Sequence, residues 1–141
     1  MTTEGTNPRS KILVPVDEGD GSFLAITSAA DAARVGGGSL ILVTVAPLPE
    51  TSEQRDEAIE VNQRRLEQLA HRVRDVPVET RVSLAGDPVR GIVEVARDEG
   101  VERIVMAHGS DDGLLGFFDS SIAAELHEQA PVPVTVLQPS D

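Results

Sequence analysis

The sequence VERIVMAHGSDDGLLGFFDSSIAAELHEQAPVPVTVL, residues 101–137, combines two apolar segments, a glycine-containing linker and a helical segment. The apolar run at 104–106 predicts a strand that is covered on both faces of a sheet. Residues 108–119 follow neither a helical nor a strand period, so we expect a loop. Ligands of parallel α/β sheets bind outside the carboxyl ends of the strands, and we therefore expect the binding site at this loop.

A helix and a final strand follow the loop. Asp119 or Ser120 is expected to cap a helix that continues to Ala130. Pro131 cannot continue a helix, because its ring fixes φ and removes the backbone N–H. The alternating valines at 132–136 then predict the last strand.

The first hundred residues alternate in the same way. Apolar runs predict strands at residues 11–17, 39–46 and 76–84. Expected helices begin at Asp20 or Ser22, after Thr51 and at Asp87-Pro88, and the first and third end at glycines 36–38 and 100. The order βαβαβαβαβ predicts an α/β fold, a three-layer doubly wound sandwich with a five-stranded parallel sheet and right-handed crossovers.

The helix expected after Thr51 is long and polar. Thr51 and Gln54 have the spacing of a capping box. Asn62 interrupts the apolar stripe of this helix, so we expect its first half to be weakly anchored to the sheet. The stripe consists of Ile59, Leu66, Leu69 and Val73.

The composition restricts the partners of the chain. It has 24 acidic and 12 basic residues, a net charge of −12, and a single lysine, Lys11. Such a surface repels nucleic acid and anionic lipid, so we expect neither nucleic acid nor a membrane as a partner. Acidic excess with scarce lysine also raises the hypothesis of adaptation to high salt, where cations screen the self-repulsion. The absence of cysteine excludes disulfides and thiol catalysis.

The pattern indicates one domain. Residues 1–10 are polar and predict a flexible N-terminal arm, and residues 11–138 a single domain. The arm contains no apolar segment typical of a signal peptide, so we expect a cytoplasmic protein.

Several segments resemble the universal stress protein family in the same order. They are ILVPVD (12–17), LILVTV (40–45), GDPVRGIVEVA (86–96), and IVMAHG, SSIAAEL and APVPVTVL between 104 and 137. The resemblance covers about residues 11–137. It implies the adenine nucleotide alpha hydrolase-like fold with strand order 3-2-1-4-5, and a homodimer formed through the last strand, where Val132, Val134 and Val136 would meet.

Some members of that family bind ATP with a Gly-x2-Gly-x9-Gly-Ser/Thr loop. The alignment implied by the resemblance places Ala107, Ser110 and Ser120 at the glycine positions and Ser121 at the hydroxyl position, with Gly109 one residue early. Carboxylates at Asp111, Asp112 and Asp119 would repel a triphosphate unless a divalent cation or high salt intervenes. The phosphate loop is therefore interpreted as degenerate, and its small residues as turn formers.

The adenosine half of the family's site is better preserved. The resemblance places Asp17 where a carboxylate would meet the adenine or ribose, with Pro15 and Val45 as apolar contacts. The other interpretation of Asp17 is a helix cap or turn residue.

Three functions follow as hypotheses. The first is a non-catalytic, cytoplasmic stress-response module that works as a homodimer, with no catalytic residues, no metal site and no required cofactor. The second is an adenine-nucleotide sensor that binds ATP with Mg²⁺ through Asp17, Val45 and the 107–121 loop. The third is a slow nucleotide hydrolase centred on His108, which follows the fourth expected strand.

Overall fold

The computed structural model describes residues 10–17, 21–107 and 120–138 of the chain. The elements are β1 (Lys11–Pro15), α1 (Gly21–Gly36), β2 (Ser39–Ala46), α2 (Ser52–Ala70), β3 (Val78–Leu84), α3 (Pro88–Glu99), β4 (Arg103–Ala107), α4 (Ser120–Gln129) and β5 (Val134–Leu137). The five strands form one parallel sheet in the order β3-β2-β1-β4-β5. The expected doubly wound α/β fold and its strand order are confirmed.

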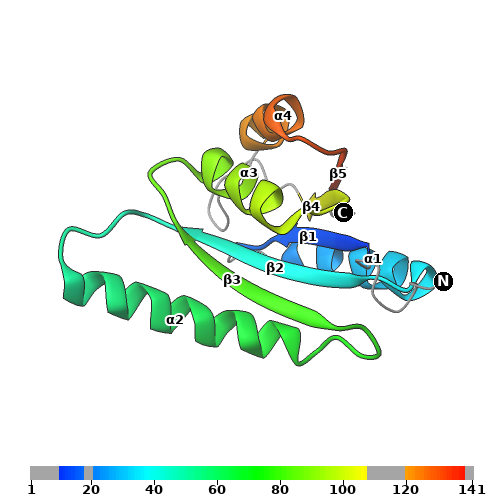
Figure 1. The fold of residues 1–141 in the computed structure, drawn as a ribbon, viewed down its shortest axis with the longest axis horizontal. Helices are drawn as coiled ribbons and strands as arrows, with labels where there is room; N and C mark the ends of the chain where they lie inside the picture. The colour runs from blue at the N-terminus through cyan, green and yellow to red at the C-terminus, as the bar shows by residue number, and fades with distance from the viewer. Residues whose placement is uncertain (1–9, 18–20, 108–119, 139–141) are drawn as a thin grey trace.

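Helices cover both faces of this sheet (Figure 1). On one face, α1 packs against β1 and β4, and α2 packs against β2 and β3. On the other face, α3 packs against β1, β2 and β3, and α4 lies beside α3 and against β5. The carboxyl ends of all five strands therefore meet at one edge, because every crossover is a helix that returns the chain to the opposite edge.

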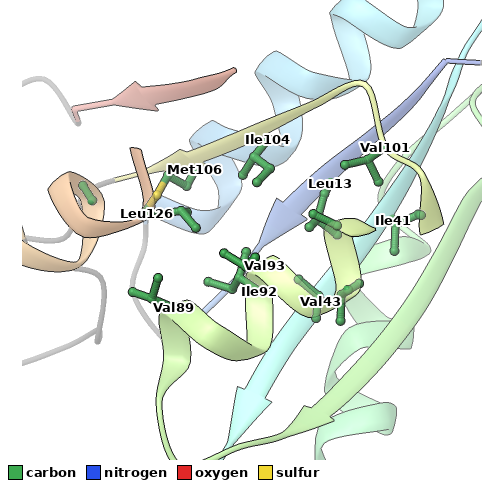
Figure 2. Close-up of a cluster of buried hydrophobic side chains, with 13 residues drawn as sticks. Leu13, Ile41, Val43, Val89, Ile92, Val93, Val101, Ile104, Met106 and Leu126 are labelled. Carbon is green, nitrogen blue, oxygen red and sulfur yellow. The ribbon is translucent and has the colours of Figure 1, made fainter. Parts of the chain in front are cut away.

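Alternate residues of β1 contribute to two separate cores. Leu13 belongs to the cluster of Figure 2, where it packs with residues of the other strands and of α3, such as Ile104 and Ile92. Ile12 and Val14 face the opposite way, toward the alanines of α1. Burying one such aliphatic side chain stabilises the fold by about 1.5–3 kcal/mol, so both faces of the sheet hold the domain together.

Prolines explain where two strands begin. β3 starts at Val78 and β5 at Val134, two residues later than expected in each case. Each start directly follows a proline, Pro77 or Pro133. The carbonyl of a proline can accept a hydrogen bond from the neighbouring strand, but a proline has no N–H to donate. These carbonyls accept hydrogen bonds from the amides of Leu40 and Ile104, both at 3.0 Å.

The ends of the helices follow the expected chemistry, with one correction. The Asp87 side chain accepts a hydrogen bond from the Val89 amide at 3.0 Å, Pro88 opens α3, and Gly100 ends it in the left-handed region at φ 62°. Ser22, in contrast, lies inside α1 and does not cap it. α4 ends at Gln129, one residue before the expected end, and its expected cap Asp119 lies outside the described residues, as do Asp20 and residues 1–9 of the predicted arm.

The beginning of α2 has a shifted capping box. The Thr51 hydroxyl accepts from the Gln54 amide at 3.1 Å, as expected, but the Gln54 side chain accepts from the Glu50 amide at 2.9 Å and not from that of Thr51. Within α2, only Leu66 is fully buried. The first half of this helix is thus held mainly by its own cap and its later turns, as the sequence predicted.

Candidate functional site

A cleft of about 320 Å³ opens at the carboxyl ends of β1, β2 and β3, between α2 and the start of α3. Its volume is at the lower end of the range of small-molecule sites. Most of its wall is apolar, with a few polar side chains. The lining residues are Val16, Asp17, Thr44, Val45, Ala46, Pro47, Asn62, Arg65, Ala85, Gly86 and Pro88.

Asp17 lines the cleft just beyond the carboxyl end of β1. The Ser22 hydroxyl oxygen accepts from the Asp17 amide at 3.0 Å. The same hydroxyl lies 3.3 Å from the Asp17 carbonyl oxygen and 3.4 Å from its carboxylate, and it can donate its one proton to either. Ser22 is 5% exposed, so this link between α1 and the end of β1 is shielded from water. Ser22 thus fixes the position of Asp17 through direct hydrogen bonds, a role that its expected position as a helix cap did not suggest.

The end of β2 forms the adjoining wall. The Val16 amide donates to the Val43 carbonyl at 2.8 Å, and the Thr44 hydroxyl donates to the Val16 carbonyl at 3.2 Å. These bonds join the chain after β1 to β2 beyond the regular ladder. Val45 is half-buried and lines the cleft.

Two polar side chains of α2, Asn62 and Arg65, line the same cleft. The Asn62 amide nitrogen donates to the Ala58 carbonyl at 2.7 Å, and an Arg65 guanidinium nitrogen donates to the Asn62 side-chain oxygen at 2.9 Å. Sequence reasoning treated Asn62 as a defect in an apolar stripe and did not single out Arg65. The signal that could have identified Asn62 was its side-chain amide, at a position where the helical period predicts an aliphatic residue.

The other predicted site residues lie apart from this cleft or outside the described chain. Pro15 is buried in β1, and its neighbour Val16 lines the cleft in its place. Ala107 ends β4, on the other side of β1 from β2, and Ser120 and Ser121 begin α4. Gly109, Ser110 and His108 lie outside the described residues.

The valines predicted at the dimer contact are half-buried. Val132, Val134 and Val136 pack against the core cluster that α3 and α4 cover within the same chain. β5 pairs with β4 on one side. In the described part of the chain β5 is an edge of the sheet.

The described residues contain neither a cluster of metal ligands nor a membrane-spanning helix. Among them no group of three or more His, Asp or Glu side chains is placed to hold a metal ion. No helix among the described elements is long and apolar enough to cross a membrane.

The sheet is doubly wound, with its order reversing at β1, and it has a cleft at its carboxyl edge. These features define the class of doubly wound α/β proteins, in which ligands commonly bind at the carboxyl ends of the strands. The model of the universal stress protein family matches residues 8–138. The chain therefore belongs to the universal stress protein family.

Solved structures of this family have the same fold. The universal stress protein from Archaeoglobus fulgidus is 22% identical, with a TM-score of 0.68 over 92% of this chain and 93% of that chain. A universal stress protein in complex with cAMP is 21% identical, with a TM-score of 0.72 over 95% and 100% of the two chains. The Archaeoglobus fulgidus protein in complex with dAMP is 23% identical, with a TM-score of 0.66 over 90% and 96%. No curated protein sequence matches the chain.

Proposed function

We propose that this protein is a non-catalytic nucleotide-binding module whose cleft receives the nucleoside part of an adenine nucleotide. The observation that carries the proposal is the cleft at the ends of β1 and β2, with Asp17 and Val45 in its wall. A flat base fits against apolar side chains such as Val45, while a carboxylate accepts hydrogen bonds from ribose hydroxyls. Similar structures have been solved with cAMP and dAMP, which are both adenine nucleotides with one phosphate.

The residues at the phosphate end support a preference for nucleotides with one phosphate. Glycines would allow backbone amides to approach an anion closely, whereas this chain has Ala107 and Ser120 at two of those positions. Asp111 and Asp112 add negative charge in the sequence between them. A triphosphate would therefore bind more weakly than a monophosphate and would depend on Mg²⁺ to offset the carboxylates.

The proposed response acts through a homodimer, with the edge of β5 as the contact. An unpaired edge strand favours pairing with another strand, and a copy of the same strand can satisfy it by two-fold symmetry. Nucleotide binding next to β1 would then be transmitted to a partner through the dimer. The proposed module includes no catalytic step.

Calorimetric titration with AMP, and with ATP with and without Mg²⁺, tests this proposal. We expect AMP to bind, and we expect Asp17→Asn to weaken AMP binding by about tenfold or more, since it removes a charged acceptor worth ~1.5–3 kcal/mol. Asp56→Asn, at an exposed position of α2 away from the cleft, is the control and should bind normally. Absence of AMP binding, or equal binding by Asp17→Asn, would overturn the proposal.

A further inference from the structure

A groove of about 190 Å³ lies between α1 and the C-terminal end of α2, and is called the α1–α2 groove below. Its floor is apolar, because Ile26 and Ala30 of α1 lie there beside Leu69 and Val73. The volume is below the range of small-molecule sites and equals the share of liquid volume of about six water molecules. The α1–α2 groove therefore has room for one apolar side chain of a protein segment rather than for a whole small-molecule ligand.

The rim of this groove is basic, in a chain with 24 acidic and 12 basic residues. Arg34 pairs with Asp31 at 2.8 Å and donates to the Arg74 carbonyl at 2.9 Å, which ties α1 to the segment after α2. The guanidinium groups of Arg72 and Arg74 have no carboxylate partner and no hydrogen bond among the described residues. Asp75, next along the chain, does not line the groove. Two positive charges at the rim are thus unpaired within the described chain.

The hollow between α3 and α4 provides a contrast. Its charged residues are two carboxylates, Asp87 and Glu94, and two arginines, Arg90 and Arg97. Their charges cancel, so that hollow favours neither an acidic nor a basic partner. The positive excess at the α1–α2 groove is therefore not a general consequence of the arginine content of the chain.

Phe23 adds an exposed aromatic ring to the same rim. It is 41% exposed, and the guanidinium carbon of Arg72 lies 4.7 Å from the centre of its ring. This cation–π contact uses the flat face of the guanidinium and leaves the N–H groups at its edge available to an acceptor. Aromatic residues and arginine are also the residues that most often carry the binding energy of protein interfaces.

We propose that the α1–α2 groove binds an acidic segment of a partner protein, which inserts one apolar side chain into the groove and places carboxylates on Arg72 and Arg74. The planar fork of a guanidinium matches a carboxylate with two parallel hydrogen bonds. The net negative charge of the rest of the surface disfavours contact elsewhere, so charge directs such a segment to this place. Physiological salt limits the range of charges to ~8 Å, and the local arginines therefore outweigh distant carboxylates. This inference does not depend on nucleotide binding.

Fluorescence anisotropy with a labelled synthetic peptide, Ser-Glu-Glu-Leu-Glu-Glu-Ser, tests the inference at one fixed salt concentration. The wild-type chain should bind this peptide. A second peptide with serine in place of leucine has the same charge and should bind about tenfold more weakly, because it lacks the apolar side chain that the groove buries.

Three variants locate the binding. Combined Arg72→Gln and Arg74→Gln should weaken binding of the leucine peptide by about tenfold or more, since both charged donors are lost. Arg55→Gln removes an exposed arginine of α2 outside the groove and is the matched control, with unchanged binding. Thr27→Leu lies at an exposed position of the groove wall, so it should fill the groove, leave the fold and the arginines in place, and weaken binding several-fold.

Contrary outcomes are distinct. Absence of binding by the wild type, or equal binding of the two peptides, overturns the inference. Unchanged binding in the double variant with a lower melting temperature also overturns it, because the arginines would then serve only to complement the dipoles at the ends of α1 and α2. A wild-type oligomer that dissociates in the double variant, measured by light scattering, would show that a second copy occupies the groove and would overturn the separate partner.

Discussion

Gly91 controls how closely α3 approaches the wall of the cleft. A Cβ atom at this position would lie 3.0 Å from the Ser83 hydroxyl oxygen and 3.1 and 3.2 Å from the two methyl carbons of Val45. Ordinary van der Waals contact needs more space than this, so the absence of a side chain allows α3 to pack directly behind Val45. A residue in the helix layer thus shapes a surface that it does not itself line.

Gly91→Ala should weaken the binding of AMP while the free energy of unfolding changes little. The higher helix propensity of alanine, about 1 kcal/mol, opposes a steric cost of ~1–3 kcal/mol, so the free energy of unfolding should change little. Val45 can relieve the contact by moving toward the cleft, and we expect the affinity for AMP to fall several-fold in calorimetry. Gly36→Ala is the control, because no atom lies within 4 Å of its added Cβ. A large loss of stability with normal binding would contradict this prediction.

At the scale of single elements, β5 has an outer backbone edge that pairs with no other strand among the described residues. The Ile104 amide donates to the Pro133 carbonyl at 3.0 Å. In a parallel ladder the next bond to Ile104 comes from Thr135, so Val134 and Val136 direct their backbone N–H and C=O groups away from β4. Their side chains are partly covered by their own core. A dimer contact at β5 would therefore depend on backbone pairing as well as on the valine side chains that the sequence emphasised.

Val136→Pro tests the dimer through this edge. Proline removes an outward N–H and leaves the ladder with β4 in place, as is tolerated on edge strands. We expect light scattering to give about twice the 15.0 kDa chain mass for the wild type and a shift toward the monomer for the variant. Thr135→Pro, which breaks the bond to β4, should instead lower the melting temperature. A monomeric wild type would refute the proposed dimer.

At the scale of the whole molecule, the charge is unbalanced. The net charge is −12, and the first half of α2 carries a group of exposed carboxylates. This group comprises Glu53, Asp56, Glu57 and Glu60. Their mutual repulsion opposes folding at low ionic strength, and salt shortens its range from ~10 Å at 0.1 M to ~3 Å at 1 M.

The free energy of unfolding should therefore rise between low and molar KCl in denaturant titrations. A variant with Glu53→Gln, Asp56→Asn and Glu57→Gln should be more stable than the wild type at low salt and should gain less from KCl. These positions lie away from the cleft, so unchanged binding of AMP would show that the variant is correctly folded. A stability that is independent of KCl would exclude the salt-adaptation hypothesis.

Much of the fold could be read from the order of residues, because each element carries its own signal. Apolar runs marked the strands, and Asp87, Pro88 and Gly100 marked both ends of α3. The starts of β3 and β5 were predicted two residues too early, because a strand begins where its hydrogen bonds to the neighbouring strand begin. Pro77 and Pro133 continue the extended chain but have no N–H to donate.

The site was predicted only in part. Asp17 follows β1 and Val45 lies near the carboxyl end of β2, and the family resemblance had pointed to both residues. Asn62 and Arg65 could not be placed in this way, because their role depends on how α2 crosses the ends of β2 and β3.

Local chemistry was therefore enough to specify the alternation of elements and the buried faces, since periodicity, caps and turns act between near neighbours in the chain. The family was indicated by the resemblance of whole segments to known sequences. The cleft arises from packing between segments far apart in the sequence, since Gly91 of α3 lies behind Val45 of β2 and Arg65 of α2 lines the cleft beside Asp17. Its shape and polarity depend on distances between helices and strands, which no local pattern encodes.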